Sequence, residues 1–147
     1  MKRKASAVWN GSLKEGKGNL TTQSGALKQQ MYSFNTRFGE DGTVGTNPEE
    51  LIAAAHAGCF TMATGATLNG EGYIPEELST EATLDLVFEN GGYTIKGIHL
   101  ELTGNVPGID NAKFQEIAQN AKANCPVSKA LSVPITLTAS LVAEKAV

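Results

Sequence analysis

The sequence is poor in cysteine and in charge. It has two cysteines among 147 residues, and its charged fraction of 18% is at the low end for a globular protein. Two cysteines are too few for a disulfide framework, so they are either small hydrophobic residues or carry redox or metal chemistry. The net charge is −3, and the only dense basic run is Lys2-Arg3-Lys4. This balance argues against nucleic acid as the main partner.

The chain also lacks a recognisable export signal. Residues 1–10 have a basic start but no apolar run, so we expect a cytoplasmic protein with reduced cysteines. Residues 51–69 carry no formal charge, yet they are mostly Ala, Gly and Thr and include His56 and Asn69. Such a stretch inserts poorly into a bilayer. We interpret it as a buried helix and expect no membrane partner.

The length of 147 residues fits a single domain spanning 1–147. In its first part, short extended runs alternate with glycine-rich turns, which predicts a small antiparallel sheet. The expected strands are residues 5–9, 19–22 and 32–37. A glycine-rich loop is expected over residues 38–46.

A long helix is predicted from a cap at Asn47 to about Asn69, where Gly70 ends it. Asn47 can serve as its N-cap, Pro48 fits the first helical position, and two glutamates follow in the first turn. Apolar and small residues surround its axis, which predicts burial on all sides. About 22 residues give a helix of roughly 33 Å. One protomer of this size cannot easily enclose that length, so we expect a homodimer around it.

After residue 75 the pattern changes to a period of two. Residues 79–88 and 93–103 predict a hairpin across Asn90-Gly91-Gly92. A second helix is predicted from a cap at Asp110 to just before Pro126, and a last strand over 135–141. The second helix has one apolar face, formed by Phe114, Ile117, Ala118 and Ala121. The predicted class is α+β.

The two cysteines lie in different predicted elements, and on their own they are ambiguous. Cys59 falls in the middle of the long helix and Cys125 at the end of the second. An Ala-rich helix favours simple packing for a cysteine. His56, Cys59, His99 and Cys125 could together bind zinc, but they include no tight pair from a loop or hairpin. We therefore expect no metal, and interpret His56 as a satisfied core or interface histidine.

Several separated blocks of the sequence resemble one protein family. Residues 45–60 (GTNPEELIAAAHAGCF) and 124–128 (NCPVS) resemble the signature of the OsmC/Ohr family of organic hydroperoxide reductases. Residues 34–38 (FNTRF) and the pattern WNG to GKG over 9–18 are similar to the branch of osmotically inducible protein C (OsmC). The resemblance covers essentially the whole chain, in order and spacing.

This resemblance implies an OsmC-like fold, with small antiparallel sheets packed around a long central helix in an intertwined homodimer. It also implies a thiol peroxidase. By the resemblance, Cys59 matches the peroxidatic cysteine and Cys125 the resolving cysteine. Arg37 matches the arginine that contacts the reactive thiolate, and Glu49 the glutamate that orients this arginine. Glu50 remains the alternative carrier of that role.

The implied chemistry needs no cofactor. The Cys59 thiolate would attack an organic hydroperoxide and become a sulfenic acid, and Cys125 would condense with it to a disulfide. An external dithiol, which is a lipoyl group for some relatives, would reopen the disulfide. The apolar neighbours Phe60 and Met62 favour organic peroxides over hydrogen peroxide.

Helix geometry adds an expectation about the dimer. Glu49 and Cys59 lie ten positions apart, about 15 Å along one unbroken helix. We therefore expect the working Glu49 to come from the partner chain, with each site shared between protomers. Two other classes stay open: a non-catalytic module that binds small apolar ligands, and a stress-related structural protein whose cysteines are buried and inert.

Overall fold

The computed structural model describes residues 1–142, which form two compact units. Unit 1 comprises Met1–Leu51 and unit 2 begins at Ile52. The boundary falls in the first turn of helix α2 (Pro48–Gly70), which continues unbroken into unit 2. The expectation of a single domain over 1–147 remains a prediction.

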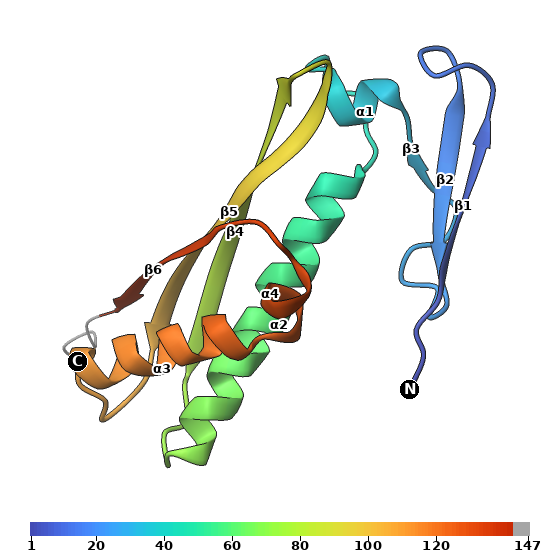
Figure 1. The fold of residues 1–147 in the computed structure, drawn as a ribbon. Helices are drawn as coiled ribbons and strands as arrows, with labels where there is room; N and C mark the ends of the chain where they lie inside the picture. The colour runs from blue at the N-terminus through green and yellow to red at the C-terminus, as the bar shows by residue number, and fades with distance from the viewer. Residues whose placement is uncertain (143–147) are drawn as a thin grey trace. The chain divides into compact units, whose positions relative to one another are not determined.

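Unit 1 is built on a small antiparallel sheet, as the sequence predicts. Strands β1 (Ala5–Asn10), β2 (Lys17–Thr22) and β3 (Gln30–Tyr32) pair in the order β1-β2-β3 (Figure 1). Gly18 in β2 is paired with both Trp9 and Tyr32, and a Cβ at this position would lie within 3 Å of both rings. The glycine thus lets the two rings meet, with centroids 5.6 Å apart.

One predicted strand of unit 1 is wrong. The sequence pattern predicted a strand over 32–37, but β3 ends at Tyr32 and Phe34–Phe38 form the short helix α1. The reason is a capping box at Ser33. The Ser33 hydroxyl accepts from the Thr36 backbone N–H at 3.1 Å, and the Thr36 hydroxyl accepts from the Ser33 N–H at 2.7 Å. These local hydrogen bonds stabilise a helical turn where the residue types favour a strand.

Helix α2 starts where the sequence predicts. Asn47 caps it, since its Oδ1 accepts from the Glu50 backbone N–H at 2.8 Å, and Pro48 is its first residue. The expected burial on all sides is not found in the single chain. One face packs inward through residues such as His56, Phe60 and Leu68, whereas the opposite face is exposed. The exposed face is small and apolar: Ala54, Ala55, Gly58, Met62 and Ala66.

Unit 2 holds a three-stranded sheet with helices on one face (Figure 1). Strands β4 (Glu77–Glu89) and β5 (Gly92–Asn105) form the predicted hairpin, with Asn90 and Gly91 at positive φ in the turn. Helix α3 (Asn111–Asn124) follows, capped by Asp110. After it, α4 (Pro126–Ala130) is a short helix that the sequence did not predict.

The last strand changes the character of this sheet. Strand β6 (Ile135–Leu141) pairs parallel to β5, so the sheet is mixed rather than antiparallel. The helical crossover through α3 and α4 returns the chain to the same end of the sheet, which a parallel pairing requires. The α+β class is confirmed.

The fully buried hydrophobic side chains among residues 1–142 all belong to unit 2. They come from α2, β5 and α3 and from Val106 and Cys125 just beyond the ends of β5 and α3, and they include the whole predicted apolar face of α3. The core residues are Phe60, Leu68, Ile98, Leu100, Leu102, Val106, Phe114, Ile117, Ala118, Ala121 and Cys125. Both α2 and α3 therefore pack on the same face of the sheet, and Cys125 lies within the core.

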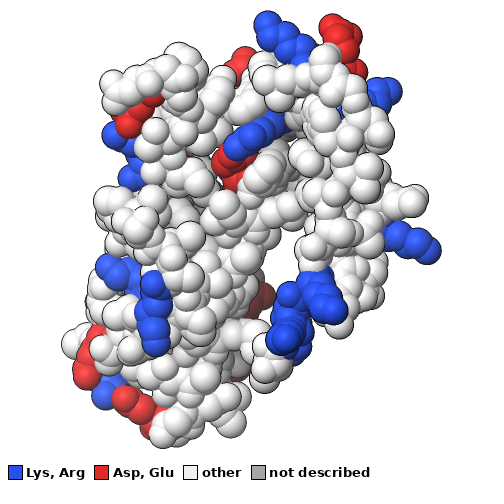
Figure 2. All heavy atoms as spheres, turned by 45° about the vertical axis from the view of Figure 1, so that its right-hand side comes forward, with Lys and Arg blue, Asp and Glu red and all other residues white. Residues whose placement is uncertain are grey.

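Charged groups are dispersed over the face drawn in Figure 2. On the face drawn in Figure 2, acidic and basic side chains are interspersed among uncharged residues and do not gather into one basic patch. Helix α2 is long and apolar enough to cross a membrane by length and composition alone. The core helix of a soluble protein meets the same criterion, and one face of α2 packs in the core of unit 2.

Candidate active site

Unit 2 brings the two cysteines together. Cys59 lies in the middle of α2, and Cys125 lies between α3 and α4, where it ends one helix and begins the other. Both thiols are free, and their side chains are hydrogen-bonded to each other. Cys59 is half-buried, whereas Cys125 is completely buried. A molecule arriving from solvent therefore meets Cys59 first.

The two thiols differ in acidity. Burial and the hydrogen bond with Cys125 raise the pKa of Cys59 above its ordinary value. Burial alone would also raise the pKa of Cys125, but hydrogen bonds from Cys59, from the Ser128 backbone and hydroxyl, and from the Val127 backbone hold it below that value. When only these neighbouring groups act on the two thiols, Cys59 keeps its proton and donates a hydrogen bond to Cys125.

His56 lies one turn before Cys59 on α2 and is completely buried. Its Nε2 is 2.7 Å from the hydroxyl of Ser128 in α4, while Nδ1 has no hydrogen-bond partner among residues 1–142. Burial lowers its pKa, so the ring is neutral at neutral pH. The expectation of a satisfied histidine is therefore correct for one nitrogen only.

The other histidine does not join the cysteines. His99 lies on β5 between the buried residues Ile98 and Leu100, so its side chain points to the opposite face of the sheet. There Nδ1 is 2.6 Å from the hydroxyl of Thr136. Cys125 belongs to the core on the helix-covered face. The set of His56, Cys59, His99 and Cys125 is thus divided between two faces of the sheet.

Unit 1 contains the predicted ion pair. Arg37 in α1 donates from Nε to both carboxylate oxygens of Glu49, at 3.1 Å each, and from Nη2 to Oε1 at 2.5 Å. The Glu49 side chain is 11% exposed and that of Arg37 37% exposed, so the pair is partly desolvated. The guanidinium carbon also lies 4.9 Å from the centroid of the Phe38 ring. Together these contacts fix the plane of the guanidinium.

This geometry distinguishes the two glutamates. Glu50 instead accepts a hydrogen bond from the Thr46 hydroxyl at 2.9 Å. Within this chain Arg37 is paired with Glu49, not with Glu50. The expectation that the working Glu49 and Cys59 of one site come from different chains stays a prediction. The capping box places Arg37 in α1, and Glu49 of the same chain lies within reach in the first turn of α2.

Arg37 also lines an aromatic pocket of about 260 Å³ within unit 1. The other lining residues are Trp9, Leu13, Tyr32, Ser33, Phe34 and Phe38. The pocket is thus an apolar hollow with one cationic group in its wall. Its size suits a small organic group.

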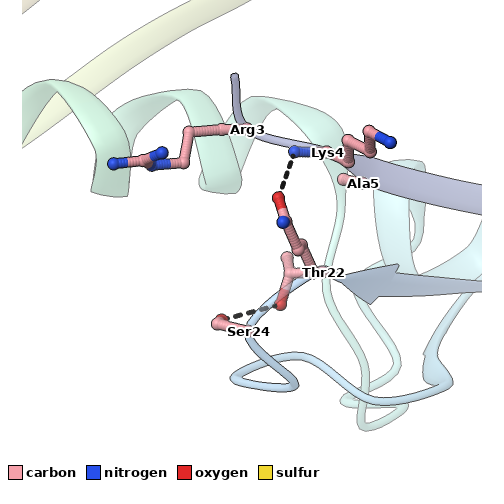
Figure 3. A pocket seen from close by; sticks show the side chains of 6 residues that line it. Arg3, Lys4, Ala5, Thr22 and Ser24 are labelled. Carbon is pink, nitrogen blue, oxygen red and sulfur yellow. Dashed lines mark hydrogen bonds between the residues drawn. The ribbon is translucent and has the colours of Figure 1, made fainter. Parts of the chain in front are cut away.

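A second, larger hollow of about 610 Å³ lies at the start of the chain (Figure 3). It is lined by Arg3, Lys4, Ala5, Thr22, Gln23 and Ser24, with no thiol, imidazole or carboxylate. Arg3 and Lys4 extend in different directions (Figure 3), and the Lys4 backbone N–H is bonded to Gln23. The groups that could do redox chemistry are elsewhere, so this hollow is not the candidate site.

Comparison with known proteins agrees with these features. The family described as OsmC-like protein matches residues 39–140. The chain belongs to this family. It is 49% identical over 135 residues to peroxiredoxin OsmC of Escherichia coli, covering 92% of this chain and 93% of the relative. It is 34% identical over 124 residues to an organic hydroperoxide resistance protein of Xanthomonas axonopodis, covering 82% and 84%.

Solved structures place the fold in the same OsmC-like family. The organic hydroperoxide resistance protein OhrB of Bacillus subtilis matches with a TM-score of 0.71 and 26% identity, over 95% of this chain and 98% of that one. An OsmC-like protein of Mycoplasma pneumoniae matches with a TM-score of 0.77 and 16% identity, over 97% and 99%. The resemblance and the OsmC-like fold predicted from sequence are therefore confirmed.

Sequence reasoning missed one constellation, the contact of His56 with Ser128. Ser128 was part of the quoted motif, but no role was given to it. The position of Ser128, three residues after Cys125 at the N-cap of α4, signals a contact with Cys125, because a side chain at that helical position faces back to the N-cap. No local signal points to His56.

Proposed function

We propose that this protein reduces organic hydroperoxides to alcohols through Cys59 and Cys125. It is a hydroperoxide-reducing peroxidase by class, since its relatives are named as peroxiredoxin OsmC and as organic hydroperoxide resistance proteins. The observation that carries the two-cysteine mechanism is the pair of hydrogen-bonded free thiols in unit 2, one half-buried and one buried.

The exposure of the two thiols supports the roles that we propose for them. The Cys59 thiolate attacks the terminal oxygen of the peroxide, the O–O bond breaks, and the alkoxide takes up a proton and leaves as the alcohol. The buried Cys125 attacks the sulfur of the resulting sulfenic acid. The S–O bond breaks, the disulfide forms, and the hydroxide leaves as water. A dithiol reductant, for which a lipoyl protein is our candidate, returns both thiols by exchange.

Arg37 has a specific task in this proposal. The contacts within unit 2 leave the proton on Cys59, so positive charge must approach Cys59 before it becomes the attacking thiolate. We assign this charge to Arg37, held in plane by Glu49. Lowering a thiol's pKa also lowers its nucleophilicity, so this effect alone accelerates attack only about two- to threefold. The larger contribution of Arg37 is to bind the peroxide and stabilise charge on the departing oxygen.

The aromatic pocket supplies a site for the organic group. We assign the apolar part of the hydroperoxide to the hollow lined by Trp9, Tyr32 and Phe34, with the peroxide oxygens at Arg37. A purely non-catalytic ligand-binding protein would use the same hollow, but it would not need two thiols in contact. We further propose that the protein acts in the cytoplasm as a homodimer, because reduced cysteines suit that compartment and one face of α2 is exposed and apolar in the single chain.

The test compares two cysteine variants with the parent protein. Cys59→Ser is expected to abolish peroxide consumption, because a serine hydroxyl is far too weakly acidic to replace the thiolate. Cys125→Ser should use one equivalent of cumene hydroperoxide to form the Cys59 sulfenic acid without a disulfide, and excess peroxide should then oxidise Cys59 to sulfinic acid, seen as added oxygen by mass spectrometry. Ser132→Ala, at an exposed position, is the control. Turnover by Cys59→Ser would refute the assignment.

A further inference from the structure

Four side chains from two segments of unit 2 form a continuous chain of hydrogen bonds. His56 Nε2 is 2.7 Å from the Ser128 hydroxyl. The Ser128 hydroxyl is hydrogen-bonded to the Cys125 thiol, and the Cys125 thiol is hydrogen-bonded to the Cys59 thiol. His56 and Cys59 share α2, whereas Cys125 and Ser128 flank the first turn of α4. The chain therefore runs from α2 to α4 and back to α2.

Because these groups are buried, it matters which atom donates and which accepts in each hydrogen bond of this chain. His56 and Cys125 are both 0% exposed, so water does not replace a missing donor or acceptor at either of these two residues. His56 is neutral, and its Nδ1 has no partner among residues 1–142. If Nε2 carries the proton, it donates to the Ser128 oxygen and leaves Nδ1 as an unpaired acceptor. The alternative tautomer leaves an unpaired buried N–H, which is rarer in proteins.

This tautomer fixes the serine hydroxyl. Because Ser128 Oγ accepts from His56, its own proton is free to point at Cys125 and donate to a thiolate there. The Ser128 backbone N–H donates to the same sulfur. Cys125 is thereby surrounded by donors that favour its ionised form, although it is buried among hydrophobic side chains.

We propose that Ser128 is a catalytic residue for the resolving step, oriented by His56 as a positioning residue, and that the pair stabilises Cys125 as a thiolate. This rests on the proposed two-cysteine function. In resolution, the Cys125 thiolate attacks the Cys59 sulfenic acid, the S–S bond forms, the S–O bond breaks, and hydroxide leaves and is protonated to water. The Cys125 sulfur is oxidised and the Cys59 sulfur is reduced.

The same pair acts in the reverse sense during recycling. An external dithiol attacks the half-buried Cys59 sulfur, the S–S bond breaks, and Cys125 leaves as a thiolate that Ser128 stabilises. A lower thiol pKa makes a better leaving group, so this arrangement directs the reductant to Cys59. His56 and Ser128 thus serve both halves of the cycle, and neither takes part in the first attack on the peroxide.

The test separates the two chemical steps in a single turnover. Parent protein, Ser128→Ala and the control Ser132→Ala are mixed with one equivalent of cumene hydroperoxide. Trapping with dimedone reports the sulfenic acid on Cys59, and mass spectrometry reports the disulfide. In Ser128→Ala, sulfenic acid formation should stay within about twofold of the parent, while disulfide formation slows roughly tenfold, the loss expected for one hydrogen bond to a charged group.

Two further variants test the positioning by His56. His56→Gln keeps a donor where Nε2 lies and should retain most of the parent's rate of disulfide formation. His56→Leu has no donor there and should lose it. Cys59→Ala leaves Cys125 as the only thiol, so its ionisation can be followed by thiolate absorbance. Adding Ser128→Ala to that variant should raise the Cys125 titration midpoint. Circular dichroism of every variant checks that the fold is intact.

The outcomes distinguish this inference from the proposed function. If the parent fails to form sulfenic acid at all, the two-cysteine function is wrong. If the parent reacts normally but Ser128→Ala leaves both the disulfide rate and the Cys125 titration unchanged, the role of Ser128 alone is refuted. Equal slowing of both steps would also refute it, because it would indicate general damage to the site.

Discussion

The contacts between Arg37 and Glu49 set the orientation of the Arg37 guanidinium. Three donor–acceptor contacts join them, and the Phe38 ring lies against the guanidinium. A lysine at position 37 would keep the positive charge but lose the planar set of donors that binds a carboxylate and a second group at the same time. The proposed role of Arg37 depends on that plane, since in this proposal the peroxide binds on the edge that Glu49 leaves unoccupied.

We therefore expect Arg37→Lys to lower kcat/KM for an organic hydroperoxide roughly a hundredfold, the scale of losing an oriented donor to a developing anion. Steady-state peroxide consumption with a dithiol reductant measures it. Arg3→Lys is the matched control, because Arg3 is exposed and its side-chain hydrogen bonds within residues 1–142 go only to Lys2 and Met1. If Arg37→Lys retained nearly the parent kcat/KM, Arg37 would be no more than a distant charge.

At the scale of residues, the sequence predicted the site residues that lie in the family motifs. Cys59, Cys125, Arg37 and Glu49 were all named through the family resemblance, and the structure places each cysteine beside the other and Arg37 beside Glu49. The contact of His56 with Ser128 was not predicted, because it joins residues 72 positions apart. No local pattern reveals such a pair, since it depends on how α4 packs against α2.

At the scale of elements, the strongly patterned segments were predicted well. Helix α2, the β4–β5 hairpin and the apolar face of α3 follow from caps, turn residues and periodicity. Helix α1 was missed because the capping box at Ser33 overrides the strand-like residue types. The parallel pairing of β6 was missed because strand direction depends on the path of the chain through α3 and α4.

The exposed face of α2 leads to a prediction about Gly58. A Cβ at Gly58 would meet no atom within 4 Å in the single chain, so Gly58→Ala should stabilise an isolated helix by about 1 kcal/mol. If a partner helix packs against this face, as we propose, the added methyl group intrudes into the interface. We expect the dimer dissociation constant to rise about tenfold, measured by sedimentation, which corresponds to the cost of overpacking.

Gly70→Ala is the control for this experiment, because it lies at the end of α2 and its Cβ would also meet nothing within 4 Å. It should leave the dimer unchanged. A Gly58→Ala protein that is more stable to denaturant and associates as the parent does would exclude this face of α2 from the interface.

At the scale of the whole molecule, the open question is which chain supplies each part of a site. Helix α2 is unbroken, so Glu49 and Cys59 of one chain are separated by about 15 Å along its axis. The Arg37–Glu49 pair forms within a single chain, so the same chain supplies both residues to a site. We therefore propose that the pair from one protomer serves Cys59 of its partner.

Subunit mixing tests this arrangement. Cys59→Ser and Glu49→Ala proteins, each inactive, are unfolded together and refolded. A heterodimer then contains one site with an intact Arg37–Glu49 pair from one chain and an intact Cys59 from the other, so activity should return. Mixing Arg37→Ala with Glu49→Ala is the control and should recover nothing, because neither chain has an intact pair. If Cys59→Ser and Glu49→Ala do not complement despite confirmed exchange, each site lies within one chain.

The central claim is that both cysteines react in one peroxide-driven cycle, and counting thiols tests it most directly. The chain has two cysteines, and both are free in the structure. After one equivalent of cumene hydroperoxide per chain, titration of the unfolded protein should find that both thiols have disappeared together, and a dithiol should restore both. Two thiols still present after the peroxide, or the loss of only one, would contradict the account.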